Sequence, residues 1–186
     1  MTAQDLSGTE VLRLARGSIE YGFVHGEPLP VQCDELPRVL TKLAATFTTV
    51  RLEDELRGCC GTLEAVHPLA KDVTRSAFRA AFRDPRFDPV GEDELGAIKL
   101  EVSVLSSLES LLVIDEADLL SRLTPGTDGL VIVADGRHAT FLPTVWEMLP
   151  DPHQFVAALK TKCGLAHDYW SERLEFQRYR TTSYAE

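Results

Sequence analysis

Residues 45–63 read ATFTTVRLEDELRGCCGTL, and this stretch decides the fold that we expect for the chain. β-Branched residues crowd its first part, residues 45–52, and such residues favour strands. The acidic trio Glu53, Asp54 and Glu55 is typical of a turn, after which residues 56–63 return as a second strand. The stretch therefore predicts an antiparallel hairpin.

The flanking sequence adds helices and a second hairpin. Apolar residues recur at helical spacing over residues 8–23, 68–84 and 152–163. They alternate strictly with polar residues over 97–105, as in a half-buried strand. Asp135-Gly136 is typical of a hairpin turn. Because hairpins are interspersed with helices, we expect an α+β fold with antiparallel sheets and flanking helices.

The composition is that of a globular domain with an acidic balance. The 186 residues are 44% hydrophobic, and 19 Lys and Arg against 29 Asp and Glu leave a net charge of −10. This charge repels a phosphate backbone, so nucleic acid is a disfavoured partner. Arg75, Arg79 and Arg83 do share one helix face. Asp72 and Asp84 flank them, which favours a solvated helix face over nucleic-acid contact.

Targeting and redox signals point to a cytoplasmic protein. Residues 1–10 lack the basic start and the apolar stretch of a signal peptide. No apolar run approaches the ~20 residues that span a bilayer, so no membrane association is expected. The four cysteines, Cys33, Cys59, Cys60 and Cys163, contain no C-x-x-C pair, and we interpret them as free thiols in a reducing compartment.

Metal and cofactor motifs are missing from the sequence. The five histidines form no H-E-x-x-H motif and no Cys/His pair at zinc-like spacing. Neither glycine-rich phosphate-binding motif occurs, and no G-x-S-x-G elbow is present. We therefore expect no metal and no cofactor.

The densest unusual cluster is Leu56-Arg57-Gly58-Cys59-Cys60-Gly61. Two glycines weaken a strand, which indicates a bulge or the close approach of a ligand or another backbone. Side-chain alternation predicts that Arg57 and Cys59 share a face, where the guanidinium would favour a reactive thiolate. The alternative is that Cys59 is a small buried hydrophobe and the glycines serve packing.

Two further residues are binding candidates. Glu101 lies on the polar side of an otherwise apolar strand, where it faces either a cleft or solvent. Thr140 belongs to the segment 137–147, which ends in a proline and Trp146 and fits either a binding wall or core.

The clusters at 56–61 and 137–147 resemble the AMMECR family, and more closely its bacterial branch, the AmmeMemoRadiSam system protein A. The most specific match is Leu56 to Gly61, the L-R-G-C-x-G signature. Supporting matches are Ala45–Phe47, Pro68-Leu69, Asp84–Phe87, Glu101–Leu105, Ala139–Pro143, Val145-Trp146, Leu149–Asp151 and Lys162–Leu165. Cys60 and His67 depart from the residues common in the family, so no role is carried over to them.

The resemblance implies a single domain over residues 1–186, built of two α/β lobes with a cleft that the signature loop borders. We place the smaller lobe within about 64–128. The resemblance also implies association with a Memo-like protein, related to non-haem iron dioxygenases, and with a radical SAM protein.

The residues and the resemblance support two functions, and the sequence leaves open whether the protein is an enzyme. In the first, Cys59 is a nucleophile or thiolate ligand in a small-molecule site, with Arg57 as its activator or anion anchor. Gly58 and Gly61 would open the backbone, and Glu101 and Thr140 would line the site. In the second, the protein is a non-catalytic partner or scaffold for the Memo-like and radical SAM proteins.

Overall fold

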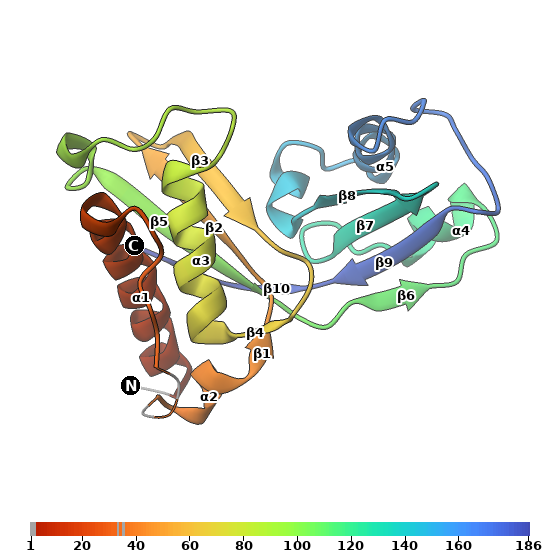
Figure 1. Ribbon diagram of the computed structural model, residues 1–186. Helices are drawn as coiled ribbons and strands as arrows, with labels where there is room; N and C mark the ends of the chain where they lie inside the picture. The colour runs from red at the N-terminus through yellow and green to blue at the C-terminus, as the bar shows by residue number, and fades with distance from the viewer. Residues whose placement is uncertain (1–2, 33, 35) are drawn as a thin grey trace. The chain divides into compact units, whose positions relative to one another are not determined.

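The computed structural model describes residues 3–32, 34 and 36–186 and divides the chain into two compact units (Figure 1). The first unit comprises residues 1–105 and 182–186, and the second comprises residues 106–181. The second unit is thus inserted between two parts of the first. The sequence places the start of the smaller lobe at about residue 64, whereas the second unit begins at residue 106. The reason is that residues 69–82 form a helix that packs within the first unit.

The first unit contains a four-stranded sheet in the order β10-β5-β2-β3. Its strands are β2 (Thr46–Leu52), β3 (Glu55–Gly61), β5 (Ile98–Leu105) and β10 (Thr181–Ala185). β2 pairs antiparallel with both β3 and β5. Glu53 and Asp54 adopt the positive φ angles, 51° and 67°, of a tight hairpin turn. The hairpin predicted from residues 45–63 is confirmed.

Two long helices cover one face of this sheet. α1 (Ala3–His25) packs on α3 and β5, and α3 (Leu69–Phe82) packs on β2 and β3 (Figure 1). The short helix α2 (Arg38–Thr41) and the two-residue strands β1 (Leu43–Ala44) and β4 (His67–Pro68) complete the unit. Their common core is apolar and includes Val11, Ile19, Leu40, Val50, Val73, Ala77, Leu100 and Val102.

The second unit contains another four-stranded sheet, in the order β6-β9-β7-β8, whose neighbours all pair antiparallel. The strands are β6 (Glu109–Leu111), β7 (Gly129–Ala134), β8 (Arg137–Phe141) and β9 (Glu175–Tyr179), and the helices are α4 (Glu116–Arg122) and α5 (Pro152–Lys162). Trp146 stacks on Phe155 with ring centroids 3.7 Å apart. Its buried indole N–H donates to the Asp128 carbonyl at 2.7 Å. With antiparallel sheets and flanking helices in both units, the predicted α+β class is confirmed.

Two sequence expectations can be compared directly with the described residues. None of the described helices is both long and apolar enough to cross a bilayer. Cys59, Cys60 and Cys163 are free thiols, as expected, while Cys33 lies outside the described residues.

Candidate functional site

The signature residues lie on β3, an edge strand, and their two faces have different surroundings. The register pairs Cys59 with Thr49 of β2, and Thr49 in turn with Glu101 of β5. Cys59, Thr49 and Glu101 therefore form one row across three strands, and all three are half-buried. The row lies on the sheet face opposite α3. Thus the structure brings two candidate residues, Cys59 and Glu101, onto the same face.

The two signature glycines are sites of close backbone approach. A Cβ at Gly58 would lie 2.0 Å from the carbonyl oxygen of Ala80 on α3. A Cβ at Gly61 would lie 2.3 Å from the carbonyl oxygen of Thr46. The sequence allowed either a ligand or another backbone to approach these glycines closely. At both positions a neighbouring backbone occupies the space. Gly58 therefore sets how closely α3 can approach the sheet.

The main chain of Cys59 is held by a motif 25 residues further on. Its N–H donates to Oδ2 of Asp84 at 2.8 Å, and its carbonyl accepts a longer bond, 3.4 Å, from Arg86. Asp84 also forms an ion pair with Arg86, at 2.6 Å. Its carboxyl is almost fully buried, with 3% of the side chain exposed. The hydrogen bond from Arg86, followed by those from the main chain, lowers the pKa of Asp84 to about 2.

The Arg57 guanidinium is directed to a different part of the unit. It forms two hydrogen bonds with Glu94, at 2.8 and 2.9 Å, and donates to the carbonyls of Asp88 and Pro89. The register shifts at Arg57, which has no partner on β2 because Gly58 lies opposite Val50 and Leu56 lies opposite Arg51. This shift interrupts the strict alternation from which the sequence placed Arg57 beside Cys59. Arg57 therefore anchors the loop before β5, and Arg86 is the cation that contacts Cys59.

Within the described ranges, the Cys59 thiol itself has one weak polar contact. The Thr49 hydroxyl lies 3.7 Å from its sulfur. Cys60, on the opposite face, packs against the core of the first unit. Burial is the main cause that raises the pKa of the Cys60 thiol, and the charge of Arg79 opposes it.

A pocket of about 130 Å³ opens where the end of β3 meets α3, and we call it the β3–α3 pocket. It is lined by Gly61, Thr62, Val66, His67, Asp72, Arg75, Ser76 and Arg79. Pro68 precedes α3, and the following helical turns bring Asp72, Arg75, Ser76 and Arg79 to this side because residues three and four apart share a helix face. The pocket is thus rich in charged and hydroxyl groups.

A buried polar network forms the floor of the pocket. Asp72 is 3% exposed, and its Oδ2 accepts from the Thr46 N–H at 2.8 Å and from the Thr46 hydroxyl at 2.7 Å. The Ser76 hydroxyl bonds those of Thr46 and Thr48 at 3.0 and 2.8 Å. Burial raises the pKa of Asp72, and the bonds from Thr46 and the charges of His67 and Arg75 oppose that rise.

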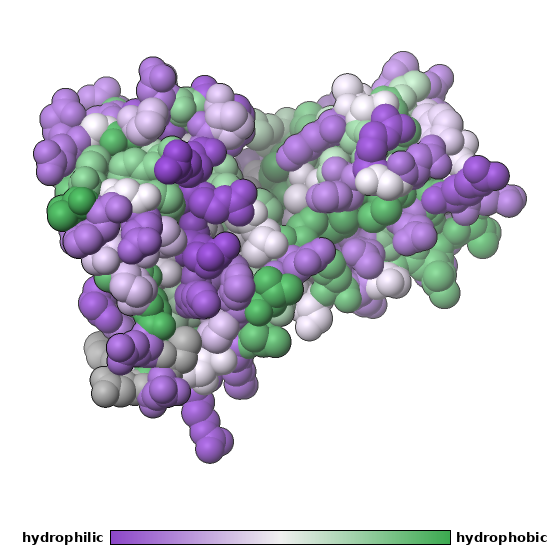
Figure 2. Space-filling view, viewed as in Figure 1, coloured by the Kyte–Doolittle hydropathy of each residue, from purple (hydrophilic) through white to green (hydrophobic). Residues whose placement is uncertain are grey.

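The rim of the pocket is cationic. Arg75 and Arg79 are exposed, and within the described part of the chain neither guanidinium forms a hydrogen bond or an ion pair. They belong to a row on α3 that begins at Lys71 and ends at Arg83, and Figure 2 shows strongly hydrophilic residues gathered over this helix. The shared helix face predicted for the arginines is therefore present. Arg86 is neutralised by Asp84 and does not extend the row.

Thr140 lies in the second unit and has a structural environment. Its hydroxyl bonds the Leu130 carbonyl at 3.0 Å and the Tyr179 hydroxyl at 2.7 Å. Both partners belong to neighbouring strands of the same sheet, so the hydroxyl joins β8 to β7 and β9.

Sequence reasoning missed most of the pocket. From the sequence alone, Asp72 is interpreted only as a charge that flanks the arginines, and nothing singles out Ser76. The sequence does contain one signal. Asp72 stands four positions before Ser76 on the buried face of the helix, and a buried carboxylate needs a polar partner in the core. Among the described residues, no three His, Cys, Asp or Glu side chains gather as a metal site requires.

Comparisons with known proteins agree on one family. The AMMECR1 family model matches residues 12–184. A protein from Sulfolobus acidocaldarius is 36% identical over 100% of this chain and 86% of its own length. Protein MJ0810 from Methanocaldococcus jannaschii is 32% identical, covering 96% of this chain and 90% of its own.

A solved structure with the same fold comes from the uncharacterized protein PH0010 of Pyrococcus horikoshii. It matches with a TM-score of 0.89 and 28% identity, over 96% of this chain and 91% of its own. The names of these relatives state no activity and no partner.

The close approach at Gly58 makes a stability prediction. We expect Gly58→Ala to lower the free energy of unfolding by about 2–3 kcal/mol, because the new methyl group must displace the backbone of α3. Gly96→Ala is the matched control, since a Cβ there meets nothing within 4 Å. Urea unfolding of the two variants measures the difference. Equal stability of the two variants would contradict the assigned role of Gly58.

The buried Asp84 carboxylate predicts a pH dependence. Its pKa is lower in the folded protein, about 2, than its ordinary value of 3.8, so it stabilises the fold above about pH 4. This contribution, about 2 kcal/mol, is lost as the pH falls from about 4 to 2. We therefore expect Asp84→Asn to be less stable than the wild type at neutral pH and equally stable near pH 2.

Urea unfolding at several pH values checks this expectation, with the exposed Asp168→Asn as control. A stability difference between wild type and Asp84→Asn that stays constant down to pH 2 would show that the Asp84 charge does not stabilise the fold.

Proposed function

This chain belongs to the AMMECR1 family, and from that premise we propose that it binds a small anionic ligand in the β3–α3 pocket. The observation that carries the proposal is the pair Arg75 and Arg79. Both residues line the pocket, and neither guanidinium has a hydrogen-bond or ion-pair partner among the described residues. Arginine presents several N–H donors in a planar fork that matches carboxylate and phosphate groups.

Besides the cationic groups, such a ligand needs partners for hydrogen bonds, and the floor of the pocket supplies them. Burial raises the pKa of Asp72, whose Oδ2 accepts from Thr46, and the Ser76 hydroxyl, which also lines the pocket, can donate or accept a hydrogen bond. His67, which also lines the pocket, adds ring nitrogens that can donate or accept a hydrogen bond. The pocket volume, about 130 Å³, admits the acidic head of a molecule rather than a whole nucleotide.

In this proposal the signature has an architectural role. Gly58 allows α3 to lie close to β3, and Gly61 lines the pocket directly. Asp84 and Arg86 hold the main chain at Cys59, so β3 presents a rigid wall to the ligand. The arrangement favours binding by preorganised groups.

A thiol-dependent reaction at Cys59 is the second form of the proposal. Its support is that Cys59 is partly exposed and shares its face with Glu101. The thiol has less activation than the sequence suggested, because Arg57 is bound to Glu94 and the contact from Thr49 is weak. Ligand binding in the pocket is therefore the better supported function, and Cys59→Ser separates the two because it should leave binding intact.

Inorganic phosphate is the probe for the pocket. We expect isothermal titration calorimetry on the full chain to show phosphate binding that Arg75→Gln and Arg79→Gln each weaken at least about tenfold, since each removes charge-assisted hydrogen bonds. Arg83→Gln is the matched control, because Arg83 lies on the same row but does not line the pocket.

Three results are informative about this proposal. If phosphate fails to bind, or if Arg83→Gln weakens binding as much as Arg79→Gln, the pocket is not a specific anion site. If Cys59→Ser alone abolishes binding, phosphate binds at the Cys59 face and not in the β3–α3 pocket, which overturns the pocket proposal and favours the second form.

A different function, docking to a partner protein, is favoured by one observation in the second unit. Leu112 and Ile114, in the loop between β6 and α4, are 86% and 83% exposed. Exposed apolar side chains that lie together are typical of interaction surfaces. We propose the Memo-like and radical SAM proteins of the resemblance as the partners, in a shared system.

Co-purification tests the docking function. The wild type should retain one of these proteins at micromolar concentration, and the double variant Leu112→Ser, Ile114→Ser should lose it because the apolar contact is removed. Exposed Met148→Ser is the control. Retention of neither protein by the wild type would reject docking.

A further inference from the structure

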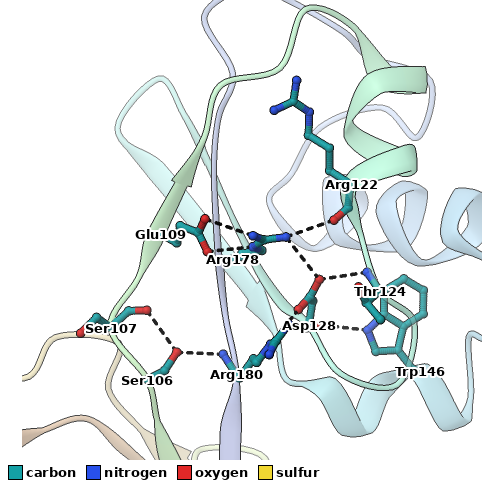
Figure 3. Close-up of polar contacts among 9 residues, drawn as sticks. All are labelled: Ser106, Ser107, Glu109, Arg122, Thr124, Asp128, Trp146, Arg178 and Arg180. Carbon is teal, nitrogen blue, oxygen red and sulfur yellow. Dashed lines mark hydrogen bonds and ion pairs between the residues drawn. The ribbon is translucent and has the colours of Figure 1, made fainter.

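A second polar pocket surrounds Asp128, in the loop that precedes β7 (Figure 3). The loop is closed on itself, because the N–H groups of Thr127 and Asp128 both donate to the Thr124 carbonyl. Trp146 fixes the other side of the loop through its bond to the Asp128 carbonyl. Asp128 itself is fully buried, at 0% exposure. Its carboxylate is therefore held in one place by the fold.

The two oxygens of this carboxylate have different surroundings. Oδ2 accepts from the Thr124 N–H at 2.9 Å and lies 3.9 Å from Arg178. Oδ1 lies 3.6 Å from Nε of Arg180, too far for a hydrogen bond. Among the described residues, Oδ1 is the one buried side-chain N or O atom without a hydrogen bond. Since leaving a buried acceptor unpaired is costly, the position calls for a donor.

The pocket next to this oxygen has a volume of about 300 Å³, and Ser106, Ser107, Glu109, Arg178 and Arg180 line it with Asp128. Arg178 is fully engaged, with two bonds of 3.0 Å to Glu109 and one to the Arg122 carbonyl. Arg180 is different, since 66% of its side chain is exposed and, among the described residues, its guanidinium forms only the long ion pair with Asp128. Most of its N–H donors are therefore directed to the pocket or to solvent.

The charges of the pocket cancel. Asp128 and Glu109 contribute two negative charges, and Arg178 and Arg180 contribute two positive charges. A ligand with a net charge would leave that charge partly buried and uncompensated, which is unfavourable. A ligand with one group of each sign adds no net charge and can satisfy both the unpaired oxygen and the exposed guanidinium.

We propose that this pocket binds a small zwitterion of the amino-acid class. Its ammonium group donates to Oδ1 of Asp128, and its carboxylate accepts from Arg180. Because the Arg180 side chain is largely exposed, it can turn from Asp128 to the ligand while the ammonium takes its place at Oδ1. The site is independent of the anion pocket in the first unit, since all of its residues belong to residues 106–181.

The twenty standard amino acids are the probes, applied one at a time to the full chain in thermal unfolding and calorimetry at up to about 10 mM. We expect at least one to bind. Analogues that lack one charge, such as propionate and ethylamine for L-alanine, should bind at least about tenfold more weakly. Arg180→Gln should weaken binding by a similar factor, and Arg173→Gln, an exposed arginine outside the pocket, should not.

Asp128→Asn provides the second test, with Arg180→Gln as the variant that retains the buried loop if Asp128→Asn fails to fold. Nuclear magnetic resonance shifts of the amides at 106–109, 128 and 178–180 locate the bound amino acid. The proposal is overturned if no amino acid binds, if the single-charge analogues bind equally well, or if Arg180→Gln keeps the wild-type affinity. Phosphate binding in the first unit is unaffected by any of these results.

Discussion

Helix α3 can lie against strand β3 because position 58 has no side chain. Ala80 of the helix places its carbonyl oxygen where a Cβ of residue 58 would be. Because the helix lies this close to the sheet, Asp72 and Ser76 can reach the hydroxyls of β2. The same approach brings Arg79 near Cys60 and the end of β3. The polar pocket of the first unit is therefore a consequence of backbone packing.

Local patterns in the sequence predicted the elements well. The β-branched run and the acidic turn predicted the β2–β3 hairpin, and the period of the apolar residues predicted α3. The orientation of Arg57 could not be predicted in the same way. Alternation along a strand holds only where no residue is inserted, and the register shift at Arg57 is not visible in composition or spacing. The partner of Arg57, Glu94, lies 37 residues away and is brought close only by the fold.

The two pockets show why candidate sites are harder to predict than elements. Asp128 stands in a Pro-Gly and Asp-Gly rich segment that is typical of an exposed turn, yet it is fully buried. Its surroundings include Trp146, Arg178 of β9 and Arg180, all distant in sequence. In the first unit, the row of arginines on α3 was visible from helical spacing. Its relation to Gly61 and His67 was not, because that relation depends on how β3 meets the helix.

The bonds that Asp84 and Arg86 form with Cys59 have a consequence for the solubility of the protein. β3 is an edge strand, and an edge offers unpaired main-chain groups to strands of other molecules. At Cys59 the N–H is already bound to a carboxylate and the carbonyl to a guanidinium. An incoming strand would have to displace the buried carboxylate of Asp84 and the guanidinium of Arg86 from the main chain of Cys59 before it could extend the sheet. The residues that support the signature thus also protect this edge against intermolecular β-pairing and aggregation.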